Sequence, residues 1–423
     1  MRFRSAPSTV QGVVQAPPSK SYTHRAILMA ALSGGPSRVQ RPLLSEDTEA
    51  TVAGIEAFGA AVRRDVHGLL VRSSGLRTPS TEVDAGNSGT TLRLLSGTAA
   101  LVGGPTILTG DATLRKRPIA PLLEGLEALG ARARSFAGDG CPPVEVRGIL
   151  RGGAVAISGA MSSQFLSSLL IAAPMASGMT VLSVLPPIRS EPYVAITLAM
   201  LRHFGIQVQA KGTAFEVRGN QSFEPTDFMV PGDFSSAAFP LVAAAISGGD
   251  VTVEALDSSL PQGDRRILDL LSQFGARVDV FEDRVRLGSR ELVAQEVDVN
   301  DIPDLFPALA VLATQAKGVS RFVNGEHLRF KESNRIEATT AFLKAMGADV
   351  TPAPDGCVVR GPSRLRGAFV DSRGDHRILM AAAVAGLVAE DAVEITDPWC
   401  FRVSYPTFLD DFRGLGASME VTS

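Results

Sequence analysis

A short pattern, an amphipathic helix that ends in an apolar residue followed by glycine, occurs six times along the 423 residues. The six glycines are Gly59, Gly130, Gly205, Gly275, Gly347 and Gly416, so by subtraction the steps between them are 71, 75, 70, 72 and 69 residues. Glycine directly after a helix adopts the left-handed C-cap conformation more easily than any other residue. The even spacing therefore predicts six structural repeats of roughly seventy residues each.

A second helix occurs once in each repeat and is apolar on nearly all sides, which predicts that it is buried. Its first residues are all good N-caps: Ser21, Ser88, Ser162, Ser235, Asp304 and Asp375. Short segments such as "AVAISG" and "GCVVRG" are typical of strands. Each repeat should therefore combine one exposed helix, one buried helix and several short strands, which indicates an α/β fold.

Six repeats suggest two domains of three. A polar, proline-containing stretch, residues 218–233, separates the third repeat from the fourth. We place the crossovers between domains near Ala16 and Phe228. The N-terminal domain is then 16–227, and the C-terminal domain is 1–15 plus 228–423, with the N-terminal strand completing it.

Composition narrows the class of protein. A formal net charge of −3, with 45% hydrophobic residues, argues against a general binder of nucleic acid or membrane surfaces. Cys141, Cys357 and Cys400 are far apart and form no metal-binding spacing, so we expect no metal site and a reducing, cytoplasmic compartment. No apolar run has membrane-spanning length, and the first residues lack a signal-peptide core, so we expect an unexported protein.

Polar and cationic residues gather at the starts of the buried helices, where a helix dipole is positive and cations are disfavoured. They are Lys20, Arg25, Asn87, Arg93, Gln164, Asp304, His376 and Arg377. One such residue is compatible with an ordinary solvated helix end. The same misplacement in several repeats favours a polyanionic ligand, and nearby Arg115, Lys116 and Arg117, with Lys331 and Arg335 around Glu332, strengthen that interpretation. Phosphate-bearing carboxylic acids are the first candidates, because guanidinium groups bind both anions in bidentate geometry.

Eight ordered segments carry a family resemblance: "PPSKSYTHRA", "DAGNSGTTLR", "GDATLRKRPI", "SSQFLSSLL", "SEPY", "NDIPD", "KESNR" and "GDHR". Together they resemble the signature segments of the 5-enolpyruvylshikimate-3-phosphate synthase family, from about Ala16 to Phe408. The resemblance implies two similar domains, each of three βαβαββ-type repeats around buried helices, an inside-out α/β barrel. It also implies transfer of the enolpyruvyl group of phosphoenolpyruvate to the 5-hydroxyl of shikimate 3-phosphate, with release of phosphate. No metal or organic cofactor is expected, and we expect a monomer whose partners are these small molecules.

The resemblance also assigns site residues, position by position. Shikimate 3-phosphate is assigned to Lys20, Ser21, Arg25, Ser162, Ser163, Gln164, Ser190, Tyr193, Asp304 and Lys331. Phosphoenolpyruvate is assigned to Lys20, Asn87, Gly89, Arg117, Gln164, Arg335 and Arg377. Serine and glutamine at a helix start offer neutral donors beside free backbone N–H groups, which suits a phosphate.

Two carboxylates meet the need for proton transfer. We expect Asp304 to be the base for the 5-hydroxyl and Glu332 to be the proton donor or the stabiliser of the cationic centre, with Lys20 assisting. Lys331 and Arg335 should favour the ionised form of Glu332, so an acid role requires burial. Taken alone, "KESNR" is more typical of a surface ion pair that opens an amphipathic helix than of a catalytic site.

The sequence departs from the family pattern at two positions. Val403 stands where the family commonly has lysine, so either its neighbour Arg402 substitutes or one phosphoenolpyruvate contact is missing. His327 stands where the family has asparagine, which puts one substrate contact in question.

Two other functions stay open. The sister enolpyruvyl transferase that acts on UDP-N-acetylglucosamine often has a cysteine before its Arg-Pro, and residues 110–117 contain none. A non-catalytic repeat protein that binds RNA ends or anions is disfavoured by Asp304 and Glu332, because carboxylates weaken an anion site unless they transfer protons.

Overall fold

The computed structural model describes residues 1–422, which form two compact units. The N-terminal unit is residues 18–230, and the C-terminal unit is residues 1–17 with 231–422. The boundaries between the two units lie two to three residues beyond the expected crossovers near Ala16 and Phe228, for two reasons. The carbonyl of Pro17 accepts a hydrogen bond from the Asp233 amide at 2.8 Å, which ties residues 16 and 17 to the C-terminal unit. Strand β14 (Phe228–Met229) pairs with a strand of the N-terminal unit.

The strands of the described residues form six four-stranded sheets with one topology. In each sheet the first strand is parallel to the second, and the third is antiparallel to both the second and the fourth. This sixfold identity confirms the repeats predicted from the glycine spacing.

The three sheets of the N-terminal unit have the following strands, in spatial order. They are β14, β3 (Pro36–Gln40), β5 (Gly68–Arg72) and β4 (Ala61–Asp65); β6 (Val83–Asp84), β7 (Thr106–Thr109), β9 (Val144–Arg147) and β8 (Arg132–Ser135); and β10 (Gly153–Ser158), β11 (Thr180–Leu185), β13 (Ala214–Val217) and β12 (Val208–Lys211).

The C-terminal unit repeats the arrangement. Its strands are β2 (Gln11–Gln15), β15 (Asp250–Glu254), β17 (Arg284–Gly288) and β16 (Arg277–Val280); β18 (Glu296–Asp298), β19 (Gly318–Val323), β21 (Gly356–Gly361) and β20 (Asp349–Ala353); and β22 (Phe369–Val370), β23 (Val393–Ile395), β1 (Arg2–Ala6) and β24 (Ser418–Thr422). Strand β1 lies between β23 and β24, so the prediction that the N-terminal strand completes this domain is confirmed.

Each repeat contributes two helices. They are α1 (Lys20–Leu32), α2 (Glu46–Ala57), α3 (Gly89–Ala99), α4 (Ala120–Ala128), α5 (Ser163–Ala172) and α6 (Pro192–His203) in the N-terminal unit, and α7 (Phe234–Ser247), α8 (Ile267–Gln273), α9 (Phe306–Thr314), α10 (Arg335–Ala345), α11 (His376–Gly386) and α12 (Phe408–Gly414) in the C-terminal unit.

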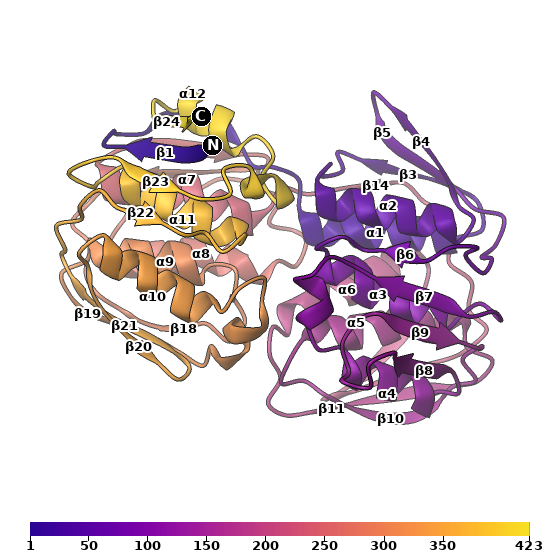
Figure 1. Cartoon of the computed structure of the whole chain (residues 1–423). Coiled ribbons are helices and arrows are strands. Elements are labelled where there is room, and N and C mark those ends of the chain that lie inside the picture. The colour runs from indigo at the N-terminus through magenta and orange to yellow at the C-terminus, as the bar shows by residue number, and fades with distance from the viewer. Residues whose placement is uncertain (423) are drawn as a thin grey trace. The chain divides into compact units, whose positions relative to one another are not determined.

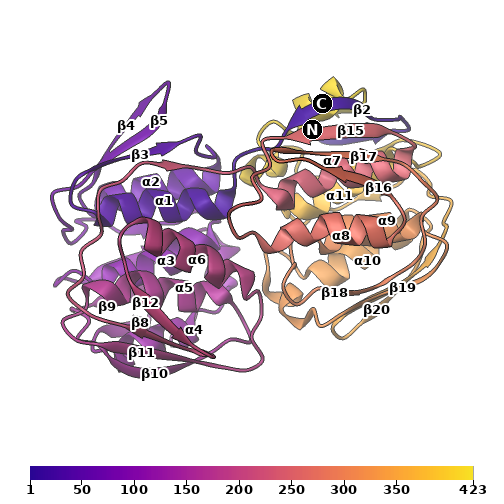
Figure 2. The same cartoon turned by 180° about the vertical axis from the view of Figure 1, so that it is seen from behind.

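The buried helices form the core of each unit. In the C-terminal unit α7, α9 and α11 pack against one another, and in the N-terminal unit α3 packs against α5. Figure 1 shows α9 and α11 between the sheet that contains β1 and the sheet that contains β20. Figure 2, from behind, shows the third sheet of this unit, with β15 and β17, beside α7. The three buried helices of this unit therefore pack against one another and against its sheets.

The helix ends test the cap predictions. All six repeat glycines have positive φ, between 80° and 104°, as the left-handed C-cap requires. Ser88, Ser162 and Asp375 are N-caps as predicted. The other three predictions are wrong, because the N-caps are Ser19, Asp233 and Leu305 rather than Ser21, Ser235 and Asp304.

Candidate active site

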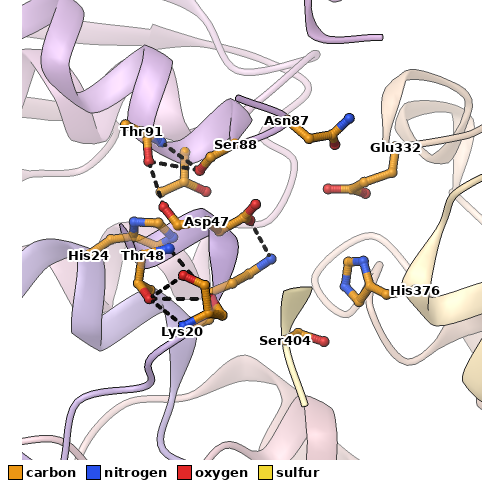
Figure 3. A network of polar contacts seen from close by, with 12 residues as sticks. Lys20, His24, Asp47, Thr48, Asn87, Ser88, Thr91, Glu332, His376 and Ser404 are labelled. Carbon is orange, nitrogen blue, oxygen red and sulfur yellow. Dashed lines mark hydrogen bonds and ion pairs between the residues drawn. The ribbon is translucent and has the colours of Figure 1, made fainter. Parts of the chain in front are cut away.

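The first predicted site residue, Lys20, begins α1 and pairs with α2. Its Nζ lies 3.0 Å from Oδ2 of Asp47, and only 15% of the Lys20 side chain is exposed. The backbone carbonyl of Asp47 accepts a hydrogen bond from Thr91 Oγ1 of α3, at 3.1 Å (Figure 3). Asp47 therefore connects the start of α1 to the start of α3. Sequence reasoning missed it because an acid in the first turn of a helix is an ordinary dipole partner.

Arg25 lies one turn further along α1 and is buried. Its Nε donates to Thr197 Oγ1 at 2.9 Å, and its Nη2 lies 3.3 Å from both Ser167 Oγ and the Tyr193 carbonyl. Burial lowers the pKa of the Arg25 guanidinium to about 10, so it remains charged at neutral pH. This cation joins α1 to α5 and α6. Ser190, also predicted, is buried just before α6 with φ of 57°.

Two guanidinium groups flank the start of α3. A Cβ added at Gly89 would lie 3.3 Å from Nη1 of Arg117 and 3.4 Å from Nη1 of Arg93. Arg117 donates to the amide oxygen of Asn87 at 2.8 Å, and the Asn87 amide donates to Asp111 at 2.7 Å. Asn87, Gly89 and Arg117, which the resemblance groups together, are neighbours in the structure.

Gln164 connects α5 to α3. Its Oε1 accepts a hydrogen bond from Arg93 Nη1 at 2.7 Å, and its Nε2 donates to Thr90 Oγ1 at 2.9 Å. The Ser162 hydroxyl caps α5 by accepting a hydrogen bond from the backbone N–H of Gln164, and Ser163 is the first residue of the helix. The first turns of α3 and α5 therefore lie side by side, with hydroxyl, amide and guanidinium donors between them. Arg93, absent from the predicted site, belongs to this group.

In the C-terminal unit the predicted residues gather around Arg335, the first residue of α10. Its guanidinium is 1% exposed and contacts three carboxylates: Asp304 at 2.6 Å, Glu332 at 2.7 Å and Asp375 at 3.0 Å. Burial alone would lower the pKa of Arg335, but the three carboxylates outweigh it and hold that pKa well above its usual value. The two predicted acids, Asp304 and Glu332, thus share one cation.

Asp304 also contacts Arg377, whose Nη2 lies 3.3 Å from its Oδ2. Burial would raise the pKa of the Asp304 carboxyl, but Arg377, Arg335 and Lys331 outweigh burial and hold that pKa well below its usual range. Asp304 is therefore ionised. Arg377 is itself oriented by the carbonyl of Ser235, which accepts from its Nη1 at 2.9 Å.

Asp375 is a further charged residue of this cluster that the predicted site omitted. It is fully buried, caps α11 by accepting from the Arg377 amide at 2.9 Å, and accepts from Ser333 Oγ at 2.9 Å. Its capping role was visible in the sequence, whereas its ion pair with Arg335, forty residues away, was not.

The structure shows where the residues at the two departures from the family pattern lie, His327 and Arg402 beside Val403. His327 is buried in the 3₁₀ helix Glu326–Phe330. Arg402, in the 3₁₀ helix Cys400–Val403, holds its guanidinium carbon 4.2 Å from the centre of the Trp399 ring, a cation–π contact. Among the described residues, no cluster of three or more His, Cys, Asp or Glu side chains could hold a metal ion, and no helix is long and apolar enough to cross a membrane.

Comparisons with known proteins agree with one another. The family described as EPSP synthase (3-phosphoshikimate 1-carboxyvinyltransferase) matches residues 5–412. A 3-phosphoshikimate 1-carboxyvinyltransferase of Methanothrix thermoacetophila is 46% identical and covers 98% of both chains. The enzyme of that name from Methanocorpusculum labreanum is 44% identical over 99% of this chain and 100% of its own. A solved EPSP synthase from Acinetobacter baumannii, 30% identical, has a TM-score of 0.83 with full coverage of both chains.

Proposed function

The chain belongs to the EPSP synthase family, and on that premise we propose which of its residues bind the substrates and carry the reaction. The chain is an enzyme of the shikimate pathway, which leads to chorismate and the aromatic amino acids. It transfers the enolpyruvyl group of phosphoenolpyruvate to the 5-hydroxyl of shikimate 3-phosphate and releases phosphate.

The observation that carries the assignment is the pair of guanidinium groups at Gly89. Arg93 and Arg117 hold like charges within a few ångströms of one backbone position, at the positive end of α3. Their amide partners, Gln164 and Asn87, orient the two groups without adding a negative charge. An anion at this position would relieve the repulsion and bind both arginines. We assign that place to phosphoenolpyruvate, with Lys20, Arg335 and Arg377 as its further cations.

Shikimate 3-phosphate is assigned to the donors at the starts of α1, α5 and α6 and to residues of the C-terminal unit. The residues are Lys20, Ser21, Arg25, Ser162, Ser163, Gln164, Ser190, Tyr193, Asp304 and Lys331. The Ser162 hydroxyl at the positive end of α5 supports a phosphate there. Arg25 acts partly through others, since it orients Ser167, Thr197 and the Tyr193 backbone.

The reaction needs a proton on the methylene carbon of phosphoenolpyruvate, attack of the 5-hydroxyl oxygen on the adjacent carbon, and loss of phosphate and of one methyl proton from the tetrahedral adduct. We assign the removal of the hydroxyl proton to Asp304 and the proton donation to Glu332, with Lys20 assisting. A carboxylate whose pKa is depressed by Arg335 and Arg377 is a weak base. Anionic substrate groups that bind these two arginines would raise the pKa of Asp304, so the base strengthens only when substrate is present.

We also propose the architecture of each unit, the location of the protein and its oligomeric state. Buried helices that pack against sheets support an inside-out α/β barrel for each unit, and the two compact units support the two expected domains. Free Cys141, Cys357 and Cys400 support a reducing, cytoplasmic location. We also infer a monomer without nucleic-acid or membrane partners. Light scattering coupled to size exclusion tests the monomer, and a mass of two chains would contradict it.

A phosphate-release assay tests the function. With phosphoenolpyruvate present, we expect release with shikimate 3-phosphate as acceptor and none with UDP-N-acetylglucosamine. The substitution Gly89→Ala places a methyl group against Arg93 and Arg117, so it should raise the KM for phosphoenolpyruvate more than that for shikimate 3-phosphate. Gly414→Ala is the control, because a Cβ there meets nothing within 4 Å. Equal effects of Gly89→Ala on both KM values would contradict the assignment of this position.

A further inference from the structure

A second cluster of arginines lies in the N-terminal unit, away from the candidate active site. A surface pocket of about 580 Å³ is lined by Arg132, Arg147 and Arg151, with glycines, Ile149, Leu150 and Ser177, and by no acidic residue. All three arginines are exposed. Among residues 1–422, no hydrogen bond or ion pair involves any of the three guanidinium groups. The pocket therefore presents about three uncompensated positive charges on a chain whose net charge is −3.

Two of these arginines face each other across a strand pair. Arg132 of β8 is the register partner of Arg147 of β9. Directly opposed side chains on antiparallel strands have their Cβ atoms about 5 Å apart, and like charges in that position are destabilising. On the same two strands, the rung of Arg134 and Glu145 holds opposite charges, with a contact of 3.3 Å. One pair of facing residues on these strands therefore has opposite charges, whereas another pair, Arg132 and Arg147, has like charges.

The sixfold repeat shows that the fold does not require this arrangement. Counted from the repeat glycine, the equivalent rung in four of the other sheets holds Ala61 and Arg72, Arg277 and Gly288, Asp349 and Arg360, or Ala6 and Ser418, and in the fifth sheet the position of Arg132 is taken by Gln207. None of these is a pair of like charges. Two opposed arginines are therefore particular to this repeat, and an anion between them would relieve their repulsion.

Helix ends offer a different explanation, since cations are favoured near helix C-termini. The pocket does lie where α3, α4 and α5 have ended, at Gly103, Gly130 and Ser177. Backbone amides already satisfy carbonyls there: Leu150 donates to Ala100 at 3.1 Å and Arg151 to Leu129 at 2.8 Å. The dipole effect accounts for cations near these ends, but it does not account for two of them standing directly opposed on one strand pair.

We propose that Arg132, Arg147 and Arg151 form a binding site for a small anion with two or more phosphate groups, such as pyrophosphate or a nucleoside polyphosphate. Guanidinium forks bind phosphate oxygens in bidentate geometry, and a diphosphate carries close to the charge that three arginines neutralise. The site is separate from the candidate active site, because α3 and α5 have 11 and 10 residues and so place about 15 Å between their two ends.

Calorimetric titration of the full chain with pyrophosphate tests the proposal. Saturating shikimate 3-phosphate is present so that donors of the candidate active site are occupied. We expect saturable binding that weakens as ionic strength rises, and an affinity at least about tenfold lower in Arg147→Gln, which loses charged hydrogen bonds. Arg134→Gln is the matched control, because Arg134 lies on the same strands but pairs with Glu145, and it should bind as the unmodified chain does.

Thermal unfolding without any added anion separates the two explanations of the cluster. If the arginines serve a ligand, Arg147→Gln removes repulsion and leaves the Tm unchanged or higher. A lower Tm would show that the arginines stabilise the helix ends and would overturn the proposal. Equal pyrophosphate affinity in Arg147→Gln and the unmodified chain, orthophosphate binding as tightly as pyrophosphate, or tighter binding of a single-stranded oligonucleotide would each overturn it too.

Discussion

At the scale of the residue, the two acids that share Arg335 have different expected roles but one expected consequence. Asp304→Asn and Glu332→Gln should each lower kcat by about 10² or more, the usual scale for a lost acid or base, with substrate binding within about an order of magnitude. Asp301→Asn is a control on the same segment, since within residues 1–422 Asp301 accepts only a local hydrogen bond from Asn300. Near-normal turnover in either variant would remove that residue from the mechanism.

Asp264 gives a pH-dependent prediction. Its carboxyl is buried in the 3₁₀ helix Gly263–Arg266 and accepts a hydrogen bond from Ser235 Oγ. Burial, followed by the charge of Asp304, raises its pKa to about 7, whereas the unfolded chain has a pKa of about 3.9. The unfolded state loses its proton first, so the carboxyl's contribution to the free energy of unfolding is complete below about pH 4 and is lost as the pH rises towards about 7.

Asp264→Asn should abolish this pH dependence, because an amide does not ionise and still accepts from Ser235. We therefore compare the Tm of Asp264→Asn with the Tm of the unmodified chain. The difference, variant minus unmodified chain, should be larger at about pH 8 than at about pH 5. Differential scanning calorimetry at the two pH values measures this. An unchanged difference would mean that Asp264 is ionised throughout.

At the scale of the element, the start of α11 depends on one side chain. Asp375 both caps the helix and neutralises Arg335, which is buried. Asp375→Ala removes the cap and one of the three carboxylates around a buried cation, so it should lower the free energy of unfolding by about 3–5 kcal/mol. Asp375→Asn keeps the cap and should cost less. Urea denaturation measures both, and a loss below about 1 kcal/mol in Asp375→Ala would contradict the role of Asp375.

At the scale of the whole molecule, we expect shikimate 3-phosphate to bring the two units closer together. Cations gather at helix starts in both units, and we assign residues of each unit to this ligand, which is what a ligand needs to shift a conformational equilibrium. The chain passes between the units twice, at 17–18 and at 230–231, and these two connecting segments can act as a hinge. Small-angle scattering should show a smaller radius of gyration with ligand but not with inorganic phosphate. An unchanged radius at saturation would exclude this movement and leave the assigned chemistry intact.

The sequence by itself determined the repeats and the kind of ligand. Gly59 and its five counterparts mark helix ends by a local rule, since positive φ suits glycine, and the structure has all six in that conformation. Apolar helices predicted the core, and the misplaced cations predicted an anion site. These inferences depend on residues close together in the chain, so no knowledge of the tertiary structure was needed.

Only the tertiary structure decided which charges meet. The pairs of Lys20 with Asp47, Arg335 with Asp375 and Arg117 with Asn87 join residues 27, 40 and 30 positions apart. Long-range contacts of this kind depend on how helices pack, and periodicity contains no information about that. The same reason explains why Asp304 is not an N-cap: its carboxylate contacts two buried guanidinium groups, and these ion pairs, not the helix start, hold it in place.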